Sequence, residues 1–257
     1  MDLTDNLEIV CRTDIGQIRE RNEDAVGSHA SIGLVVLADG MGGYQAGEVA
    51  SKMAVDIILS EIKAKYQQAM ESADKDVLTG ISPASSLIEK AILKVNSSIY
   101  SAAQGKTQYQ GMGTTTLVVM MHKNLISIGH VGDSRLYRLR DNKLELLTED
   151  HSLVRERVRN GLYTEAEARE AKNKNVLTRA LGIADRVKPE LQEDTALLGD
   201  LYLLCSDGLN DMAEENEIKN VLSRYKEDLN QAADQLIQLA NRMGGKDNIS
   251  VILLRSV

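Results

Sequence analysis

Three short apolar runs follow one another in the middle of the chain: Thr116-Leu117-Val118-Val119-Met120, Ile126-Ser127-Ile128 and Leu136-Tyr137-Arg138-Leu139. Each run is rich in β-branched and aliphatic residues and is bounded by Gly, Asn or Asp, which is typical of β-strands. The polar steps Lys123-Asn124 and Asp141-Asn142 predict tight turns beside these runs. Residues 114–148 therefore predict an antiparallel meander.

Similar strand-like runs lie on both sides of this region, at residues 34–37, 201–204 and 249–253. Helical periodicity separates the strand groups. It involves Ala50, Met53, Ala54, Ile57 and Ile58, then Leu87, Ala91, Val95 and Ile99, and then Ala233, Leu236, Ile237 and Ala240. Helices in blocks between groups of strands predict an α+β fold in which helices cover the outer faces of packed sheets. With 257 residues, 43% of them hydrophobic, we expect one compact domain.

The composition excludes several classes of protein. The net charge is −8 and Lys and Arg form no dense run, so a nucleic-acid partner is not expected. The first residues are acidic and no apolar run approaches about 20 residues, so we expect a cytoplasmic protein that does not bind membranes. Cys11 and Cys205 lie in apolar runs and predict buried thiols. Neither has an arginine six positions later, so a thiolate phosphatase mechanism is not expected.

Four aspartates stand at the ends of the predicted strands. Asp39-Gly40-Met41-Gly42-Gly43 closes one apolar run, and Asp207 follows another. Asp247 precedes the last run, and Asp133 lies between two strands of the predicted meander. Hard oxygen ligands of this kind favour Mg²⁺ or Mn²⁺. The histidines lack zinc spacing, and we interpret them as surface residues or satisfied core residues: His29, His122, His130 and His151.

Upstream, residues 13–24 set Arg19 and Arg21 beside acidic residues, which alone would indicate only a solvated charge cluster. Taken in order, however, the motifs closely resemble the metal-dependent protein phosphatase family, also called type 2C or PPM, in its compact bacterial form. The resemblance runs from about residue 10 to the C-terminus and rests on these blocks: Arg19 with Glu23-Asp24, Asp39-Gly40-Met41-Gly42-Gly43 with Ala46-Gly47-Glu48, Gly111-Met112-Gly113-Thr114-Thr115, Gly132-Asp133-Ser134-Arg135, Thr178-Arg179-Ala180-Leu181-Gly182, Ser206-Asp207-Gly208 and Gly245-Lys246-Asp247-Asn248.

This resemblance implies a central β-sandwich of two antiparallel sheets flanked by helix pairs, in α-β-β-α layers, with a pair of Mn²⁺ or Mg²⁺ ions at one end. Asp39 would bridge the two metals, and the carbonyl of Gly40 with the carboxylates of Asp207 and Asp247 would complete the ligand shells. Glu23 and Asp24 would hold coordinated waters, and Arg19 would grip the phosphate.

Two further features follow from the family. Asp133, with Asp207, matches the position of a third, weaker metal, although its side chain could equally bond its own turn. Residues 151 to about 175 match the family's flap, but Ala171-Lys172 stands where many relatives have His-Pro. Met41 occupies the position of a proposed proton donor in animal members and cannot act as one.

The implied activity is hydrolysis of phosphoserine and phosphothreonine by water activated between two cations, with Arg19, Asp39 and Asp207 as the catalytic residues. We expect a monomer that acts in signal transduction on substrates of a bacterial Ser/Thr kinase. Two alternatives stay open: a catalytically weak module that binds phosphoproteins, and a phosphatase dedicated to one signalling partner. Asp74-Lys75-Asp76 resembles an aspartyl-phosphate nucleophile pair, but it follows no apolar strand and indicates a solvated turn.

Overall fold

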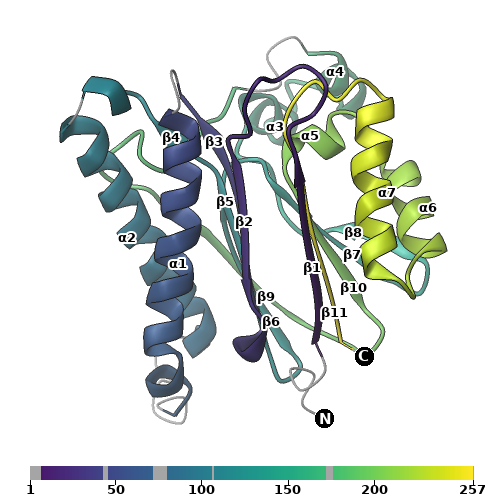
Figure 1. Cartoon of the computed structure of the whole chain (residues 1–257), viewed down its shortest axis with the longest axis horizontal. Coiled ribbons are helices and arrows are strands. Elements are labelled where there is room, and N and C mark those ends of the chain that lie inside the picture. The colour runs from purple at the N-terminus through teal and green to yellow at the C-terminus, as the bar shows by residue number, and fades with distance from the viewer. Residues whose placement is uncertain (1–6, 43–45, 72–79, 106, 172–175, 257) are drawn as a thin grey trace.

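The computed structural model describes residues 7–42, 46–71, 80–105, 107–171 and 176–256. In this part of the chain, two antiparallel sheets pack face to face and helices cover the outer face of each sheet (Figure 1). The predicted α-β-β-α sandwich is confirmed. Gly43, Lys172 and the Asp74-Lys75-Asp76 step lie outside the described residues.

The first sheet has five strands in the order β1-β11-β10-β7-β8. Their bounds are β1 Leu7–Asp14, β11 Ile249–Ser256, β10 Leu201–Cys205, β7 Arg135–Arg140 and β8 Lys143–Leu146. The second sheet has the order β2-β3-β5-β6-β9, with a short β4 paired to β3. Its strands are β2 Asp24–His29, β3 Leu34–Met41, β5 Thr116–His122, β6 Leu125–Val131, β9 Glu190–Thr195 and β4 Gly113–Thr114.

Two pairs of helices form the outer layers. The pair α1 (Ala46–Glu71) and α2 (Pro83–Gly105) covers the second sheet, and the pair α6 (Glu215–Arg224) and α7 (Leu229–Arg242) covers the first. The short helices α3 (Leu153–Arg159), α4 (Glu165–Glu170) and α5 (Asp207–Asn210) lie together at the upper end of the sandwich in Figure 1. Single 3₁₀ turns are η1 (Ala30–Ile32) and η3 (Thr107–Tyr109). Among the described helices, none combines the length and hydrophobicity of a membrane span.

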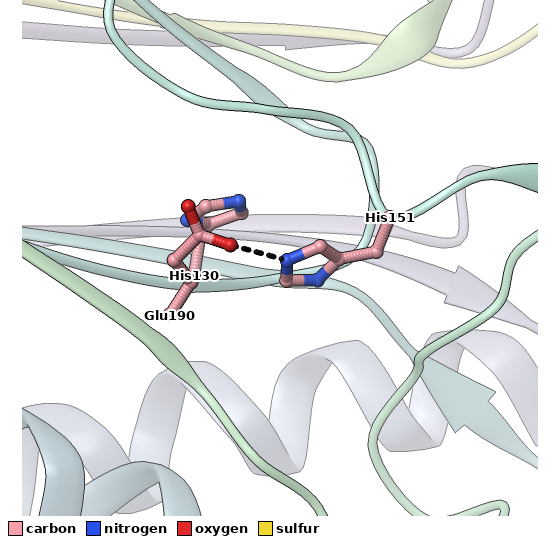
Figure 2. A group of neighbouring side chains, drawn as sticks. All are labelled: His130, His151 and Glu190. Carbon is pink, nitrogen blue, oxygen red and sulfur yellow. Dashed lines mark hydrogen bonds and ion pairs between the residues drawn. The ribbon is translucent and has the colours of Figure 1, made fainter. Parts of the chain in front are cut away.

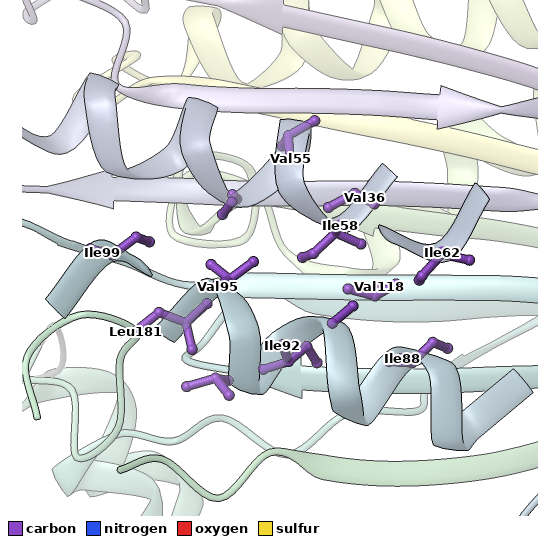
Figure 3. Close-up of a cluster of buried hydrophobic side chains, with 14 of the residues drawn as sticks. Val36, Val55, Ile58, Ile62, Ile88, Ile92, Val95, Ile99, Val118 and Leu181 are labelled. Carbon is purple, nitrogen blue, oxygen red and sulfur yellow. The ribbon is translucent and has the colours of Figure 1, made fainter. Parts of the chain in front are cut away.

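Strand alternation divides the interior into three cores. In β3, Val35 and Leu37 point between the sheets, whereas Val36 points toward α1 and α2. Figure 3 shows Val36 beside Ile58 of α1, and Ile92 of α2 belongs to the same buried cluster. The third core lies between the first sheet and α6 with α7. Both faces of the inner strands are therefore buried, which explains why these strands are nearly continuous apolar runs.

The predicted meander over residues 114–148 is wrong in one respect. Strands β5 and β6 form one hairpin and β7 and β8 form another, but the two hairpins belong to different sheets. The chain crosses between the sheets at Gly132, whose φ is +111°. A Cβ atom there would lie 2.6 Å from the Cβ of Thr115, so only glycine fits. The hydrophobic pattern of the sequence cannot show this crossing, because the strands before and after Gly132 have the same apolar pattern whether or not they share a sheet.

A buried carboxylate closes the turn between β9 and β10. Asp200 is 2% exposed and accepts hydrogen bonds from Nε and Nη2 of Arg140, at 2.7 and 2.5 Å. It also accepts from the amide of Leu197 and the hydroxyl of Tyr202. Burial opposes ionisation, but these hydrogen bonds outweigh it and lower the pKa of Asp200.

We expect Asp200→Asn to lower the free energy of unfolding by roughly 1.5–3 kcal/mol at pH 7, because it removes the charge from the hydrogen bonds between a buried carboxylate and the partly exposed guanidinium of Arg140. The lowered pKa means that this stability is present above the carboxyl's unfolded pKa and is lost as the pH falls through the folded value. The difference between wild type and variant should therefore narrow below about pH 4 in urea titrations. The exposed ion pair of Asp234 with Arg12 gives a control, and Asp234→Asn should change the stability by at most about 1 kcal/mol. A difference for Asp200→Asn that is independent of pH would contradict the linkage.

Candidate functional site

The predicted metal ligands come from both sheets and meet at one end of the sandwich. Asp24 opens β2 and lies directly opposite Asp39 on β3 in the register of the two strands. Asp207 follows β10 as the first residue of α5, and Asp247 lies just before β11. The hydroxyl of Ser206 donates to Oδ2 of Asp24 at 2.8 Å and so joins the two sheets at this point.

The carboxylates are close enough to repel one another. Burial and the charges of Asp24, Asp207 and Asp133 raise the pKa of Asp39 well above its usual value. Burial and the charges of Asp133, Asp211 and Asp247 do the same for Asp207. A cluster of like charges in a partly buried place costs free energy unless a cation neutralises it. The arrangement therefore suits divalent cations with oxygen ligands.

Asp24 adds an independent sign of a missing partner. Among the described residues, its Oδ1 atom is buried and has no hydrogen-bond partner, whereas Oδ2 accepts from Ser206. Burial raises the pKa of Asp24 to about 6. A buried carboxylate oxygen without a donor is uncommon, and a water on a cation would satisfy it.

Gly40 allows three segments to approach closely beside Asp39. Its amide donates to the carbonyl of Glu23 at 3.1 Å. A Cβ atom at this position would lie 2.2 Å from the carbonyl oxygen of Gly47 at the start of α1. The glycine in the motif is thus required by packing, and it brings Glu23 next to the strand that carries Asp39.

Asp133 is linked to Asp39 through two hydroxyl groups. The hydroxyl oxygen of Thr115 accepts from the amide of Asp39 at 3.0 Å and shares a hydrogen bond of 2.8 Å with the hydroxyl of Ser134. Burial and the charge of Asp150 raise the pKa of Asp133 to about 6. The charge of Asp133 is the largest electrostatic contribution to the raised pKa of Asp207, so the turn at 132–134 belongs to the same site.

Arg19 lies at the rim of the site on the loop between β1 and β2. Its Nη2 atom is 2.6 Å from Oδ2 of Asp247, and about half of the side chain is exposed. Burial lowers the pKa of this guanidinium, but the hydrogen bond to Asp247 and the charges of Asp247, Glu23 and Asp207 outweigh it. The side chain is therefore a solvent-accessible cation beside the carboxylates, where an anionic substrate would meet it.

Asn248 fixes the loop that carries Arg19 and Glu23. Its Oδ1 accepts from the amide of Glu23 at 2.8 Å. Its Nδ2 donates to the carbonyls of Ile15 and Arg21, at 3.0 and 2.8 Å. The side chain is buried, and it uses acceptor and donor atoms together to hold three points of one loop.

All the predicted site residues thus gather at one end of the sandwich, while their chemical roles stay predictions. Thr115, Ser206 and Asn248 lie within the sequence motifs, but their roles in holding the site together were not predicted from the sequence. The signal that could have identified them is a polar residue next to an aspartate in an otherwise apolar, buried stretch.

The prediction of buried, inert thiols is confirmed for Cys205, since burial raises its pKa to about 12. Cys11 is half-buried, and burial raises its pKa as well.

A cleft of about 810 Å³ opens beside the carboxylates. Asp133 and Asp207 line one part of it, and the walls come from β7, from α3 and α4, and from the segment 210–216. The flap region thus forms one wall of a hollow that reaches the predicted metal ligands. A substrate chain next to a bound phosphate would have room there.

Comparison with known proteins agrees with the geometry. The sequence profile described as Protein phosphatase 2C matches residues 17–248. The serine/threonine phosphatase stp of Listeria welshimeri is 39% identical over 246 residues, which are 95% of this chain and 93% of that protein. The chain therefore belongs to the protein phosphatase 2C family.

Solved structures show the same fold. The serine/threonine phosphatase Stp1 from Staphylococcus aureus has a TM-score of 0.84 at 36% identity, with 99% of this chain and 97% of that chain covered. The catalytic domain of the serine/threonine protein phosphatase PstP, solved in complex with two manganese ions, has a TM-score of 0.80 at 35% identity, with 97% and 98% covered. This chain is thus similar to bacterial phosphatase domains over nearly its whole length.

We expect Asn248→Ala to lower the free energy of unfolding by roughly 2–4 kcal/mol, because it leaves one buried N–H and two carbonyls of the loop unpaired. Hydrogen exchange at the amide of Glu23 should accelerate in the same variant, which NMR or mass spectrometry can follow. The exposed Asn230, whose side chain accepts a hydrogen bond from Arg12, gives a control, and Asn230→Ala should stay within about 0.5 kcal/mol. Unchanged protection of Glu23 in Asn248→Ala would show that other contacts hold the loop.

Proposed function

We propose that this chain is a metal-dependent protein phosphatase that hydrolyses phosphoserine and phosphothreonine in proteins. The observation that carries the proposal is the group of mutually repelling carboxylates around Asp39 and Asp207, with the accessible guanidinium of Arg19 at its rim. Membership of the protein phosphatase 2C family and the names of the relatives support the same reaction.

The residues present fit a pair of Mn²⁺ or Mg²⁺ ions. Raised pKa values at Asp39 and Asp207 and the unpartnered Oδ1 of Asp24 are what a cation-binding set shows without its cations. The residues proposed to hold the ions, directly or through coordinated waters, are Asp39, Gly40, Asp207, Asp247, Glu23 and Asp24, with Asp133 for a third ion. When bound, the ions supply charge neutralisation at the phosphate and an acidified water. The two manganese ions in the PstP structure support this set of cofactors.

The side chains of this protein would orient the substrate. Arg19 extends from a loop fixed by Asn248 and can donate two N–H groups to phosphate oxygens. Asp247 holds the guanidinium from one side, and the amide of Asn248 donates to Oδ1 of Asp247 at 2.8 Å. The carboxylate is thereby kept in one orientation. Met41 has no proton to donate, so protonation of the leaving alkoxide does not come from this position.

The wider context is also part of the proposal. We infer a single phosphatase domain with a flap at about 151–175, because both helix pairs pack on one sandwich and α3 and α4 line the cleft beside Asp133. The substrates would be phosphoproteins made by a bacterial Ser/Thr kinase, in signal transduction in the cytoplasm, and the protein would act as a monomer. The similarity to bacterial phosphatases named for serine and threonine supports the substrate class.

Activity on a phosphothreonine peptide should require added Mn²⁺ or Mg²⁺ and should vanish in chelator, because open oxygen sites hold these ions modestly. Asp39→Asn and Asp247→Asn should each lower kcat at least about 100-fold while the fold is kept, as circular dichroism can check. A metal-binding protein that shows saturable phosphopeptide binding but no turnover would favour the non-catalytic module instead. Full activity of the metal-stripped wild type would contradict the metal-dependent reaction.

Arg19→Ala should raise KM for a small phosphate ester about 10-fold or more, with a smaller change in kcat, because the guanidinium binds the phosphate before and during the reaction. Arg12 on β1 carries the same charge and pairs with Asp234, away from the site, so Arg12→Ala is the matched control. Steady-state kinetics at saturating Mn²⁺ separates the two parameters. An unchanged KM for Arg19→Ala would assign phosphate binding to another group.

A further inference from the structure

A cluster of two buried histidines and a partly exposed glutamate lies outside the predicted metal centre. His130 is the penultimate residue of β6, His151 precedes the flap helix α3, and Glu190 opens β9. Possible ligand atoms of the three residues lie within 4.8 Å of one another. Figure 2 shows the three side chains drawn together from separate segments of the chain, with the bond between His151 and Glu190. Both imidazoles are almost fully buried, at 4% and 3% exposure.

The hydrogen bonds in this cluster identify the proton on each ring. The amide of Gly132 donates to Nδ1 of His151 at 3.1 Å, so this atom carries no proton. In the neutral ring the proton is then on Nε2, which donates to Oε2 of Glu190 at 3.2 Å. His130 donates from Nε2 to the carbonyl of Glu149 at 3.0 Å. Burial lowers the pKa of His151 to about 4, which keeps the ring neutral at physiological pH.

This geometry favours a hydrogen-bonded network over a site for a transition metal. The two imidazole rings are stacked, with centroids 4.6 Å apart and planes inclined by 16°. Lone pairs in two nearly parallel planes do not converge on one point, as ligands of a common ion must. A metal on Nε2 of His151 would also move the remaining proton to Nδ1, where it would meet the N–H of Gly132.

His151 instead holds one residue, Gly132, at two points. Besides accepting from the amide of Gly132 with Nδ1, it donates its own amide to the carbonyl of Gly132 at 2.9 Å. Gly132 has a φ of +111° and precedes Asp133 directly. On the other side of this turn, Arg135 makes three hydrogen bonds to Asp150, the residue before His151, at 2.9, 3.3 and 2.7 Å. The segment 149–151 thus holds the turn with Asp133 from both sides.

The same residue also joins the two ends of the flap. The carbonyl of His151 accepts from the amide of Thr178 at 2.8 Å, and Ser152 forms an isolated β-bridge with Leu177. Ser152 then caps α3 by accepting from the amide of Arg155. One residue therefore contacts the chain entering the flap, the chain leaving it, and the peptide before Asp133.

We propose that His151, with its tautomer set by Glu190, is a positioning residue that holds Asp133 beside Asp207 and ties the root of the flap to that carboxylate. The proposal rests on the phosphatase function, in which Asp133 contributes to metal binding. His151 touches neither substrate nor metal in this role. Its effect passes through the Gly132 peptide, so removal of Asp133 should abolish it.

A double-mutant cycle at saturating Mn²⁺ tests this directly. We expect His151→Ala to lower kcat about 10- to 100-fold, as loss of groups that orient metal ligands does. In the Asp133→Ala background the same substitution should change kcat less than about 2-fold, because the carboxylate that it positions is gone. Equal fold-losses in both backgrounds would overturn the proposal, since His151 would then act independently of Asp133.

Partial rescue separates the hydrogen bond from general packing. In His151→Asn, Oδ1 can still accept from the amide of Gly132, so kcat should recover several-fold relative to His151→Ala. In His151→Gln the side-chain amide reaches the position of Nε2 and not that of Nδ1, so kcat should stay as low as in His151→Ala. Leu236→Ala, in the core between α7 and the first sheet, serves as a destabilised control and should leave kcat per folded molecule unchanged. Asn and Gln variants of equal activity would contradict a role for the bond to Gly132.

Two readouts do not depend on activity. Hydrogen exchange at the amide of Gly132 should accelerate in His151→Ala and Glu190→Ala and stay slow in His151→Asn. Glu190 is partly exposed on an edge strand, so Glu190→Ala tests the hold of His151 on Gly132 even if His151→Ala does not fold. Unchanged exchange at Gly132 in Glu190→Ala, and in His151→Ala if that variant folds, would overturn the proposal, whether or not the protein is a phosphatase. Stoichiometric Zn²⁺ binding that raises the Tm of wild type and is lost in Glu190→Ala would reassign the cluster as a metal site.

Discussion

The carboxylates of Asp24, Asp39 and Asp207 repel one another where the two sheets meet, and the other features of the site follow from this repulsion. Each of the three groups is buried enough that its pKa rises, so the apo protein stores unfavourable charge at one end of the sandwich. The fold tolerates this cost because three apolar cores stabilise the rest of the molecule. Affinity for divalent cations then comes from relief of the repulsion.

Neutral polar side chains hold these carboxylates in place. Ser206 bonds to Asp24 across the sheets, and Thr115 links the backbone of Asp39 to the turn that carries Asp133. Asn248 does the same for the rim loop with Arg19. None of these supports adds charge, so they fix geometry without neutralising the site. Preorganisation of this kind keeps the ligands in position before the cations bind.

The inner strands of both sheets could be predicted from sequence, as could the apolar run around Cys11 in the edge strand β1, but the edge strands β2, β8 and β9 could not. The six predicted runs correspond to β3, β5, β6, β7, β10 and β11, which all have a neighbour on each side. The edge strands β2, β8 and β9 are shorter or more polar, because one side faces solvent and burial does not select apolar residues there. The crossing at Gly132 was missed for a different reason, since it depends on contact with Thr115. Likewise, His151 and Glu190 are 39 residues apart, and no spacing rule joins them.

Thermal unfolding of wild type and Asp39→Asn, with and without Mn²⁺, tests the central claim that cations relieve the repulsion at Asp39. Without cation, the variant should unfold at the same temperature as wild type or higher, because a like charge has been removed. With Mn²⁺ at about 100 times its Kd, wild type should gain about 2.7 kcal/mol per ion bound, and the variant much less. Equal stabilisation of both proteins by Mn²⁺, or a variant that is less stable than wild type without cation, would contradict the account.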